Sequence, residues 1–201
     1  MKKLGFLMLL LAMTLMLGGN ALAQGDNSVF FVTYYSNANT AKAPDGTLRL
    51  INDGDQSTTE YEGIPNGNLW ASIYVFDDSQ EMQECCNCYV SANGLLSESV
   101  DKELTANTLT GRDETSRGVI KVISSASYDP TNNKPEPGLR GWMTHIQAGA
   151  VAGTFNETET PLADSNLASA EDAALEMSCS FAITLGSGYG VCSCTPEDHD
   201  F

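Results

Sequence analysis

Apolar residues recur at every second position in several short stretches of this chain, a pattern that predicts β-strands rather than helices. The β-prone stretches cover residues 29–35, 46–51, 69–76, 118–123 and 140–151. The longest alternation has Leu175, Met177, Cys179, Phe181, Ile183 and Leu185 at its apolar positions. Small or polar residues fill the positions between them, so we predict a strand over residues 175–185 with one buried and one open face.

The residues that follow this alternation predict a hairpin. Gly186-Ser187 suits a two-residue type II′ turn, and residues 189–192 would form the return strand, which sets Cys179 opposite Cys194. Helix signals are thin, with two short candidates at residues 97–104 and 165–174. Longer loops are expected at residues 52–68, 110–117 and 129–138. Many short strands with Gly, Pro and Asn turns and little helix predict an all-β fold, an antiparallel β-sandwich or jelly roll.

The N-terminus has the layout of an export signal. Lys2 and Lys3 precede an apolar run to about Leu17, and Ala21-Leu22-Ala23 gives the small-x-small pattern that signal peptidase cleaves. We therefore predict a signal peptide over residues 1–23, cleavage before Gln24, and one domain over residues 24–201. The sequence contains no other apolar run long enough to span a membrane, so we expect a secreted or periplasmic protein.

The charge balance narrows the choice of partners. The chain has 26 acidic and 10 basic residues, a net charge of −16. An acidic surface of this kind repels nucleic acid and anionic lipid, both of which need a basic face. The composition suits solubility, cation binding, or self-association that depends on a screening ion.

Six cysteines form two clusters, Cys85, Cys86 and Cys88 in mid-chain and Cys179, Cys192 and Cys194 near the end. An even number of cysteines in an exported chain predicts three disulfides, and six cysteines allow 15 pairings. The predicted hairpin favours Cys179–Cys194 as the first pair. The other two bonds would then link the mid-chain cluster to Cys192 and close within that cluster. A metal or redox site is the alternative.

Two further groups of residues are candidate sites. Asp53, Asp55 and Glu60 surround a Gly turn and resemble the oxygen-rich loops that hold calcium, and a solvated turn is the alternative. Structural calcium is the one cofactor we predict. His145 lacks the Gly-x-Ser-x-Gly elbow of a hydrolase triad, and we interpret it as a structural histidine.

The first predicted strand could act between subunits. It is apolar and β-prone, and its candidate assembly residues are Val29, Phe30, Phe31, Val32, Tyr34 and Tyr35. Addition of such a strand to a neighbour's open sheet would build a polymer. The same pattern is also typical of the first strand of any sandwich.

The runs Phe31–Asn39, Ile73–Asp77 and Gln83–Cys88 resemble a group of uncharacterised exported bacterial proteins. That resemblance implies export and a cysteine framework, with no activity attached. In architecture the chain is also loosely similar to subunits of extracellular fibres. We expect a non-enzymatic structural or adhesive subunit that self-assembles outside the cell. A monomeric binding module for a metal ion, glycan or small ligand is the alternative, and a hydrolase is a third possibility.

Overall fold

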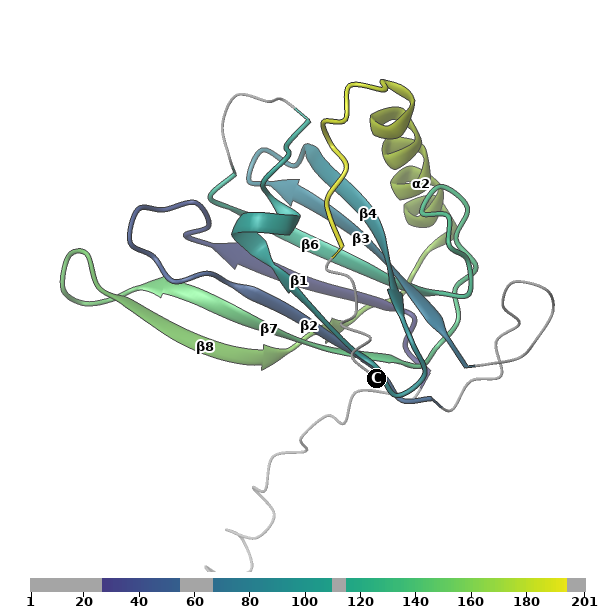
Figure 1. The fold of residues 1–201 in the computed structure, drawn as a ribbon, viewed down its shortest axis with the longest axis horizontal. Coiled ribbons are helices and arrows are strands. Elements are labelled where there is room, and N and C mark those ends of the chain that lie inside the picture. The colour runs from purple at the N-terminus through teal and green to yellow at the C-terminus, as the bar shows by residue number, and fades with distance from the viewer. Residues whose placement is uncertain (1–26, 55–66, 110–114, 195–201) are drawn as a thin grey trace, which may run out of the picture.

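Two antiparallel sheets and one helix make up the computed structural model, which describes residues 27–54, 67–109 and 115–194 (Figure 1). The five-stranded sheet has the order β4-β3-β6-β1-β9, and the four-stranded sheet has the order β5-β2-β7-β8. The strands are β1 Phe30–Ser36, β2 Thr47–Asn52, β3 Leu69–Asp77, β4 Met82–Val90, β5 Leu95–Ser99, β6 Arg117–Ser125, β7 Leu139–Ala148, β8 Phe155–Pro161 and β9 Ala163–Asp164. Five of them match predicted strands within three residues at either end.

The main core lies between the two sheets, because each strand turns alternate side chains inward. Leu48 and Leu50 of β2 face Ile73 and Val75 of β3 across this layer, and all four are fully buried. The antiparallel sandwich predicted from the sequence is therefore confirmed, with the core built by the alternation that predicted it.

Helix α2, Ser169–Thr184, adds a third layer over the outer face of the five-stranded sheet (Figure 1). It packs on a second cluster of buried residues that includes Phe30, Tyr74 and Ile123. The strand predicted over residues 175–185 is therefore wrong, and so is the hairpin that depended on it. Residues 189–192 form no return strand and make only an isolated bridge, from Val191 to Cys85. The helix predicted over residues 165–174 lies partly within α2.

Strand β4 carries the mid-chain cysteines and was not predicted, since its buried positions include Gln83 and Glu84. The short helix predicted over residues 97–104 is replaced by the end of β5 and a single π-helical turn, Val100–Leu104. The proline-containing segment 129–138 is a loop as predicted, and a bridge between Ser125 and Pro135 fixes it to β6. Within the described ranges, no helix is long and apolar enough to cross a membrane.

Candidate interaction surface on helix α2

Three disulfides fasten the C-terminal part of the chain to β4. The pairs are Cys85–Cys179, Cys86–Cys192 and Cys88–Cys194. Adjacent residues of a strand point to opposite faces, so Cys85 faces α2 while Cys86 and Cys88 face the core. The predicted pair Cys179–Cys194 is wrong because Cys179 lies on a helix and not in a hairpin. No disulfide closes within the mid-chain cluster, whereas the predicted link from that cluster to Cys192 is present.

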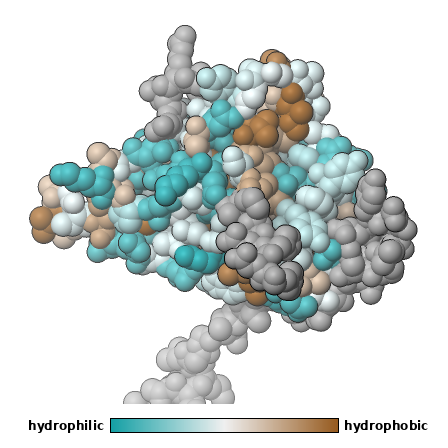
Figure 2. All heavy atoms as spheres, in the orientation of Figure 1, coloured by the Kyte–Doolittle hydropathy of each residue, from teal (hydrophilic) through white to brown (hydrophobic). Residues whose placement is uncertain are grey.

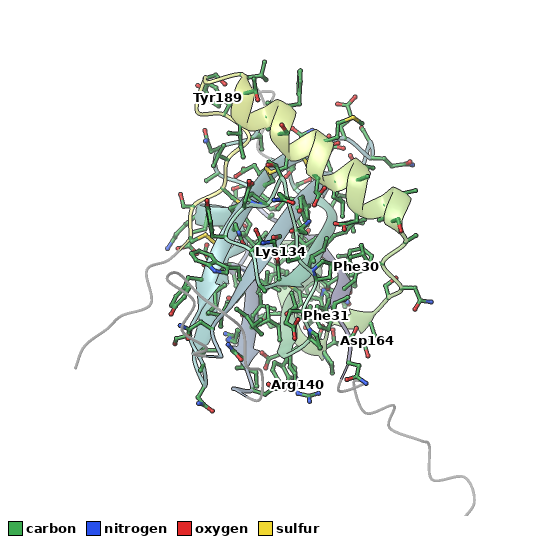
Figure 3. All side chains as sticks on the ribbon, turned by 90° about the vertical axis from the view of Figure 1, so that its right-hand side faces the viewer. Phe30, Phe31, Lys134, Arg140, Asp164 and Tyr189 are labelled. Atoms are coloured by element: carbon green, nitrogen blue, oxygen red, sulfur yellow. A yellow bond between two sulfur atoms is a disulfide. The ribbon has the colours of Figure 1, made fainter. Side chains whose placement is uncertain are left out.

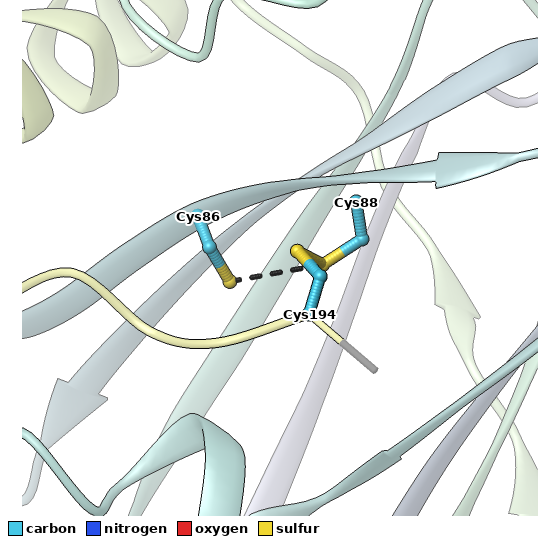
Figure 4. A group of neighbouring side chains, drawn as sticks. All are labelled: Cys86, Cys88 and Cys194. Carbon is cyan, nitrogen blue, oxygen red and sulfur yellow. Dashed lines mark hydrogen bonds between the residues drawn. A yellow bond between two sulfur atoms is a disulfide. The ribbon is translucent and has the colours of Figure 1, made fainter. Parts of the chain in front are cut away.

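The sulfur atoms of the last two bonds are close together (Figure 4). The Cys86 and Cys88 sulfurs are 3.9 Å apart, and Cys194 lies in the same group. All six cysteines are oxidised, so no thiolate is present to bind a metal ion. The protein thus uses these sulfurs as cross-links, which indicates folding in an oxidising, non-cytoplasmic compartment.

The inner face of α2 explains how the helix is held. Leu175, Cys179 and Ala182 recur at steps of four and three residues, and all are buried against the sheet. The Cys85–Cys179 disulfide reinforces this contact at the middle of the helix. Phe30 of β1 points toward the helix layer, whereas its neighbour Phe31 points into the main core (Figure 3).

Asn133, from the loop between β6 and β7, connects the N-terminal half of α2 to the sheet. Its side-chain amide donates to Asp172 Oδ1 at 3.0 Å and to Tyr74 Oη at 2.8 Å. Its backbone N–H donates to Glu176 Oε1 at 2.6 Å. Lys121 pairs with Glu171 on the other side. The acidic residues of α2 are thereby engaged with the body of the protein.

The outer face of α2 has no such partners in the described part of the chain. Its central side chains are large and apolar, yet Met177 is 71% exposed and Phe181 is 60% exposed. Leu185, just after the helix, is 50% exposed. Exposed hydrophobic residues that occur singly are ordinary, but a contiguous set on one helix face is typical of an interaction site. We use the name α2 outer stripe for the exposed residues of this face, Ala170, Ala174, Met177, Phe181, Thr184 and Leu185.

A groove of about 390 Å³ runs beside the stripe, between α2 and the neighbouring strand and loop. Met82 and Leu109 line it opposite Met177, Ser178 and Phe181. Hydrophobic surface also gathers around the C-terminal end of α2 and the segment after it (Figure 2), where Tyr189 and Val191 are exposed. The stripe and groove therefore form one apolar surface on an otherwise acidic protein.

The predicted assembly strand forms part of the chain's own sheet. Residues 30–36 pair with β6 along their whole length, and Phe31 and Val32 also pair with β9. Phe30, Phe31 and Tyr35 are buried, Val29 and Val32 are partly buried, and only Tyr34 is well exposed. The six residues thus contribute mainly to the two cores.

Of the predicted calcium ligands, Asp55 and Glu60 lie outside the described residues. The Asp53 carboxylate is 3.5 Å from the Arg140 guanidinium, which neutralises its charge. The neighbouring Asn52 side chain donates to the backbone oxygens of Gly67 and Val90, which holds the end of β2 in place. Calcium binding at this turn stays a prediction.

Two buried ionisable groups have shifted pKa values, His145 on β7 and Glu84 on β4. His145 stacks on Tyr34 with ring centroids 4.1 Å apart, and its Nε2 contacts Thr160 Oγ1 at 2.7 Å. Burial lowers the pKa of His145, so the ring is neutral at pH 7. Glu84 is fully buried on β4, and burial raises its pKa to about 7. These two groups lie on different sheets, and neither contacts a serine or cysteine nucleophile among the described residues.

An aromatic cluster lies on the outer side of the five-stranded sheet. Trp70 of β3 meets Tyr89 of β4 and Tyr128, with ring centroids 5.1 Å and 6.4 Å away. Tyr128 is 73% exposed, and Trp70 is half-buried. The exposed Tyr128 ring and the partly exposed Trp70 ring are accessible to a ligand.

Comparison with known proteins adds little to this geometry. No protein-family model matches the chain, and no curated protein matches it. The crystal structure of Thermotoga maritima 1070 is similar at a TM-score of 0.41 and 14% sequence identity, covering 71% of this chain and 97% of that one.

Proposed function

We propose that this protein is a structural or adhesive subunit that acts outside the cytoplasm by binding other copies of itself through the α2 outer stripe. The observation that supports the proposal is the exposure of Met177 and Phe181 on a helix already packed and cross-linked on its opposite face. Leaving large apolar side chains in water is unfavourable by about 25 cal/mol per Å² of apolar surface. An interface would bury them.

The cross-links suit a structural role. Each disulfide joins residues separated by 94 or 106 positions, so each one constrains a long stretch of the unfolded chain. A single such bond contributes about 2–4 kcal/mol of stability. A subunit held in this way keeps α2 in place under the variable conditions outside a cell.

Strand donation by residues 28–35 stays a prediction, but the self-association proposed here does not require it. Donation would first break the seven-residue pairing of β1 with β6. Two of the described edge strands, β4 and β8, are also poorly suited to adding strands. The C-terminal segment covers β4, since the Cys85 N–H donates to Gly190 O at 2.9 Å, and β8 exposes Glu157 and Glu159.

The test is analytical ultracentrifugation of the oxidised chain over residues 24–201, from micromolar to millimolar concentration. We expect concentration-dependent association that is lost in a Met177→Glu/Phe181→Glu variant. Val151→Glu is the matched control, because Val151 is 67% exposed at the far tip of the β7–β8 hairpin. A wild-type protein that stays monomeric at every concentration would rule out this function.

The aromatic cluster supports a second candidate, a binding module for a saccharide. Trp70 and Tyr128 offer exposed ring surface against which the apolar face of a sugar could stack, and Tyr hydroxyls could hydrogen-bond sugar hydroxyls. The test is tryptophan fluorescence during titration with soluble glucan and chitin oligosaccharides. Saturable change in the wild type, lost in Tyr128→Ala, would favour this candidate, and flat titrations would dismiss it.

A further inference from the structure

We infer that two copies of this protein pair through α2 in an antiparallel arrangement, around a two-fold axis near Met177. This inference rests on the proposed self-association and specifies its geometry. Four observations carry it: the spacing of the α2 outer stripe, the sizes of its side chains, the placement of charge along the helix, and the adjoining groove.

The spacing is that of a helix–helix contact. Ala170, Ala174, Met177, Phe181 and Thr184 follow one another at alternating steps of four and three residues, and all five are exposed. Steps of three and four keep residues on one face of a helix, and their alternation is the pattern of paired helices in coiled coils. The stripe runs the full length of a 16-residue helix, which is about 24 Å. A second helix is the occupant that matches this length and spacing.

Side-chain size indicates the direction of pairing. The stripe has alanines in its N-terminal half and larger side chains, above all Phe181, in its C-terminal half. In an antiparallel pair centred near Met177, Phe181 of one copy lies opposite Ala174 of the other, and Thr184 lies opposite Ala170. The large Phe181 then meets a small side chain, as close packing requires, and Met177 meets Met177 of the other copy at the axis. A parallel pair would set alanine against alanine and phenylalanine against phenylalanine.

Charge placement favours the same direction. The acidic residues of α2 are Glu171, Asp172 and Glu176, all in its N-terminal half, whereas residues 177–196 contain no charged side chain. Antiparallel pairing places each acidic half beside the uncharged half of the second copy. Parallel pairing would bring like charges together. Because each copy carries a net charge of −16, association should strengthen as added salt screens the overall repulsion.

The groove extends the contact beyond the helix. A single helix pair of this length covers less than the roughly 800 Å² per partner that stable interfaces bury. Met82 and Leu109 continue the apolar surface beside Met177 and Phe181. Methionine adapts its shape to a partner, which suits a contact made by two copies of one surface. We therefore expect a dissociation constant in the micromolar range or weaker.

A charge-pair rescue tests the arrangement. Phe181→Glu should weaken dimerisation at least tenfold in sedimentation equilibrium, because it would bury a carboxylate at the contact. Adding Ala174→Arg to the same chain should raise the dimerisation affinity of that variant at least tenfold. In an antiparallel pair the charge introduced at 174 in each copy faces the charge introduced at 181 in the other, which gives two ion pairs. Residues 174 and 181 lie seven positions apart in one helix, about 10 Å, so they cannot pair within one chain.

The control and the outcomes separate the two proposals. Ala170→Arg with Phe181→Glu makes the same charge change one helical turn away and should rescue less. Circular dichroism should show that each variant is folded, since residues 170, 174 and 181 are all exposed in the monomer. Association of the wild type without rescue would overturn the antiparallel register and leave the proposed function standing. A monomeric wild type would overturn both.

Discussion

Glu84 provides a test of the core that depends on pH. Its side chain is fully buried, and alternation along β4 directs it into the core on the side of Cys86. One carboxyl oxygen accepts a hydrogen bond from the Asn107 N–H at 2.8 Å, and no partner contacts the other within the described residues. Burial raises the pKa of Glu84 from its ordinary 4.5 to about 7, an effect that the Asn107 hydrogen bond partly offsets.

The direction of the pH effect follows from proton binding. Between pH 4.5 and 7 the folded protein holds a proton on Glu84 that the unfolded chain has released, so stability falls as pH rises through this range. The stability that comes from protonated Glu84 is fully present below pH 4.5 and is lost above pH 7. At 1.36 kcal/mol for each pH unit between the two pKa values, it amounts to about 3 kcal/mol.

Glu84→Gln removes this dependence while keeping the shape of the side chain and the acceptor for Asn107. We measure the free energy of unfolding in urea for both proteins. The difference between Glu84→Gln and the wild type should shift by about 3 kcal/mol in favour of the variant between pH 5 and pH 8. Glu157→Gln on the exposed strand β8 is the control and should shift little across the same range. Parallel stability curves for the wild type and Glu84→Gln would refute the assignment of a neutral buried acid.

Two further changes test how the layers are held. Removing the helix cross-link with Cys85→Ala/Cys179→Ala should lower the free energy of unfolding by about 2–4 kcal/mol. Hydrogen exchange in α2 should then become faster than in the two sheets. Equal protection of α2 in the variant and the wild type would contradict this. Gly118→Ala places a Cβ 1.9 Å from the Phe76 carbonyl oxygen in the five-stranded sheet, so we expect the free energy of unfolding in denaturant to fall by about 1–3 kcal/mol. An unchanged midpoint would show that β6 can shift at no cost.

The sequence predicted the sandwich well because its core strands obey the alternation rule. Strands β3 and β6 have one face in the main core, and the residues on that face recur at period two, as Ile73 and Val75 do in β3 and Ile120 and Val122 in β6. Strand β8 was not predicted because it is an exposed edge strand without an apolar face. Strand β4 was missed because Gln83 and Glu84 are buried despite being polar. In both strands the hydropathy pattern therefore lacks the alternation that would mark a strand.

The cysteine pairing had a usable signal in the sequence. Cys86-x-Cys88 and Cys192-x-Cys194 have equal spacing, and two extended segments side by side in parallel can join such pairs in register. The residue left over, Cys85, points to the other face of β4 and reaches Cys179 on the helix. The hairpin interpretation obscured this pattern because it gave Cys194 to Cys179.

The same misread alternation bears on function. In a helix, residues two apart lie about 200° apart around the axis, so a period-two apolar pattern divides between opposite faces. Leu175 and Cys179 lie on the inner face, and Met177 and Phe181 lie on the outer face. The buried inner residues and the Cys85–Cys179 disulfide hold the helix on the sheet. The fold therefore does not require Met177 and Phe181 to be apolar.

This division makes a final prediction. In dilute solution, where the protein is monomeric, Met177→Gln/Phe181→Gln should change the free energy of unfolding by no more than about 0.5 kcal/mol, as for other surface substitutions. Leu175→Ala, which empties a buried position of the same helix, should cost about 2–5 kcal/mol. Thermal and urea unfolding of both variants measure the contrast. A large loss from the outer pair would mean that these side chains serve the monomer, and the reason for treating them as a contact surface would disappear.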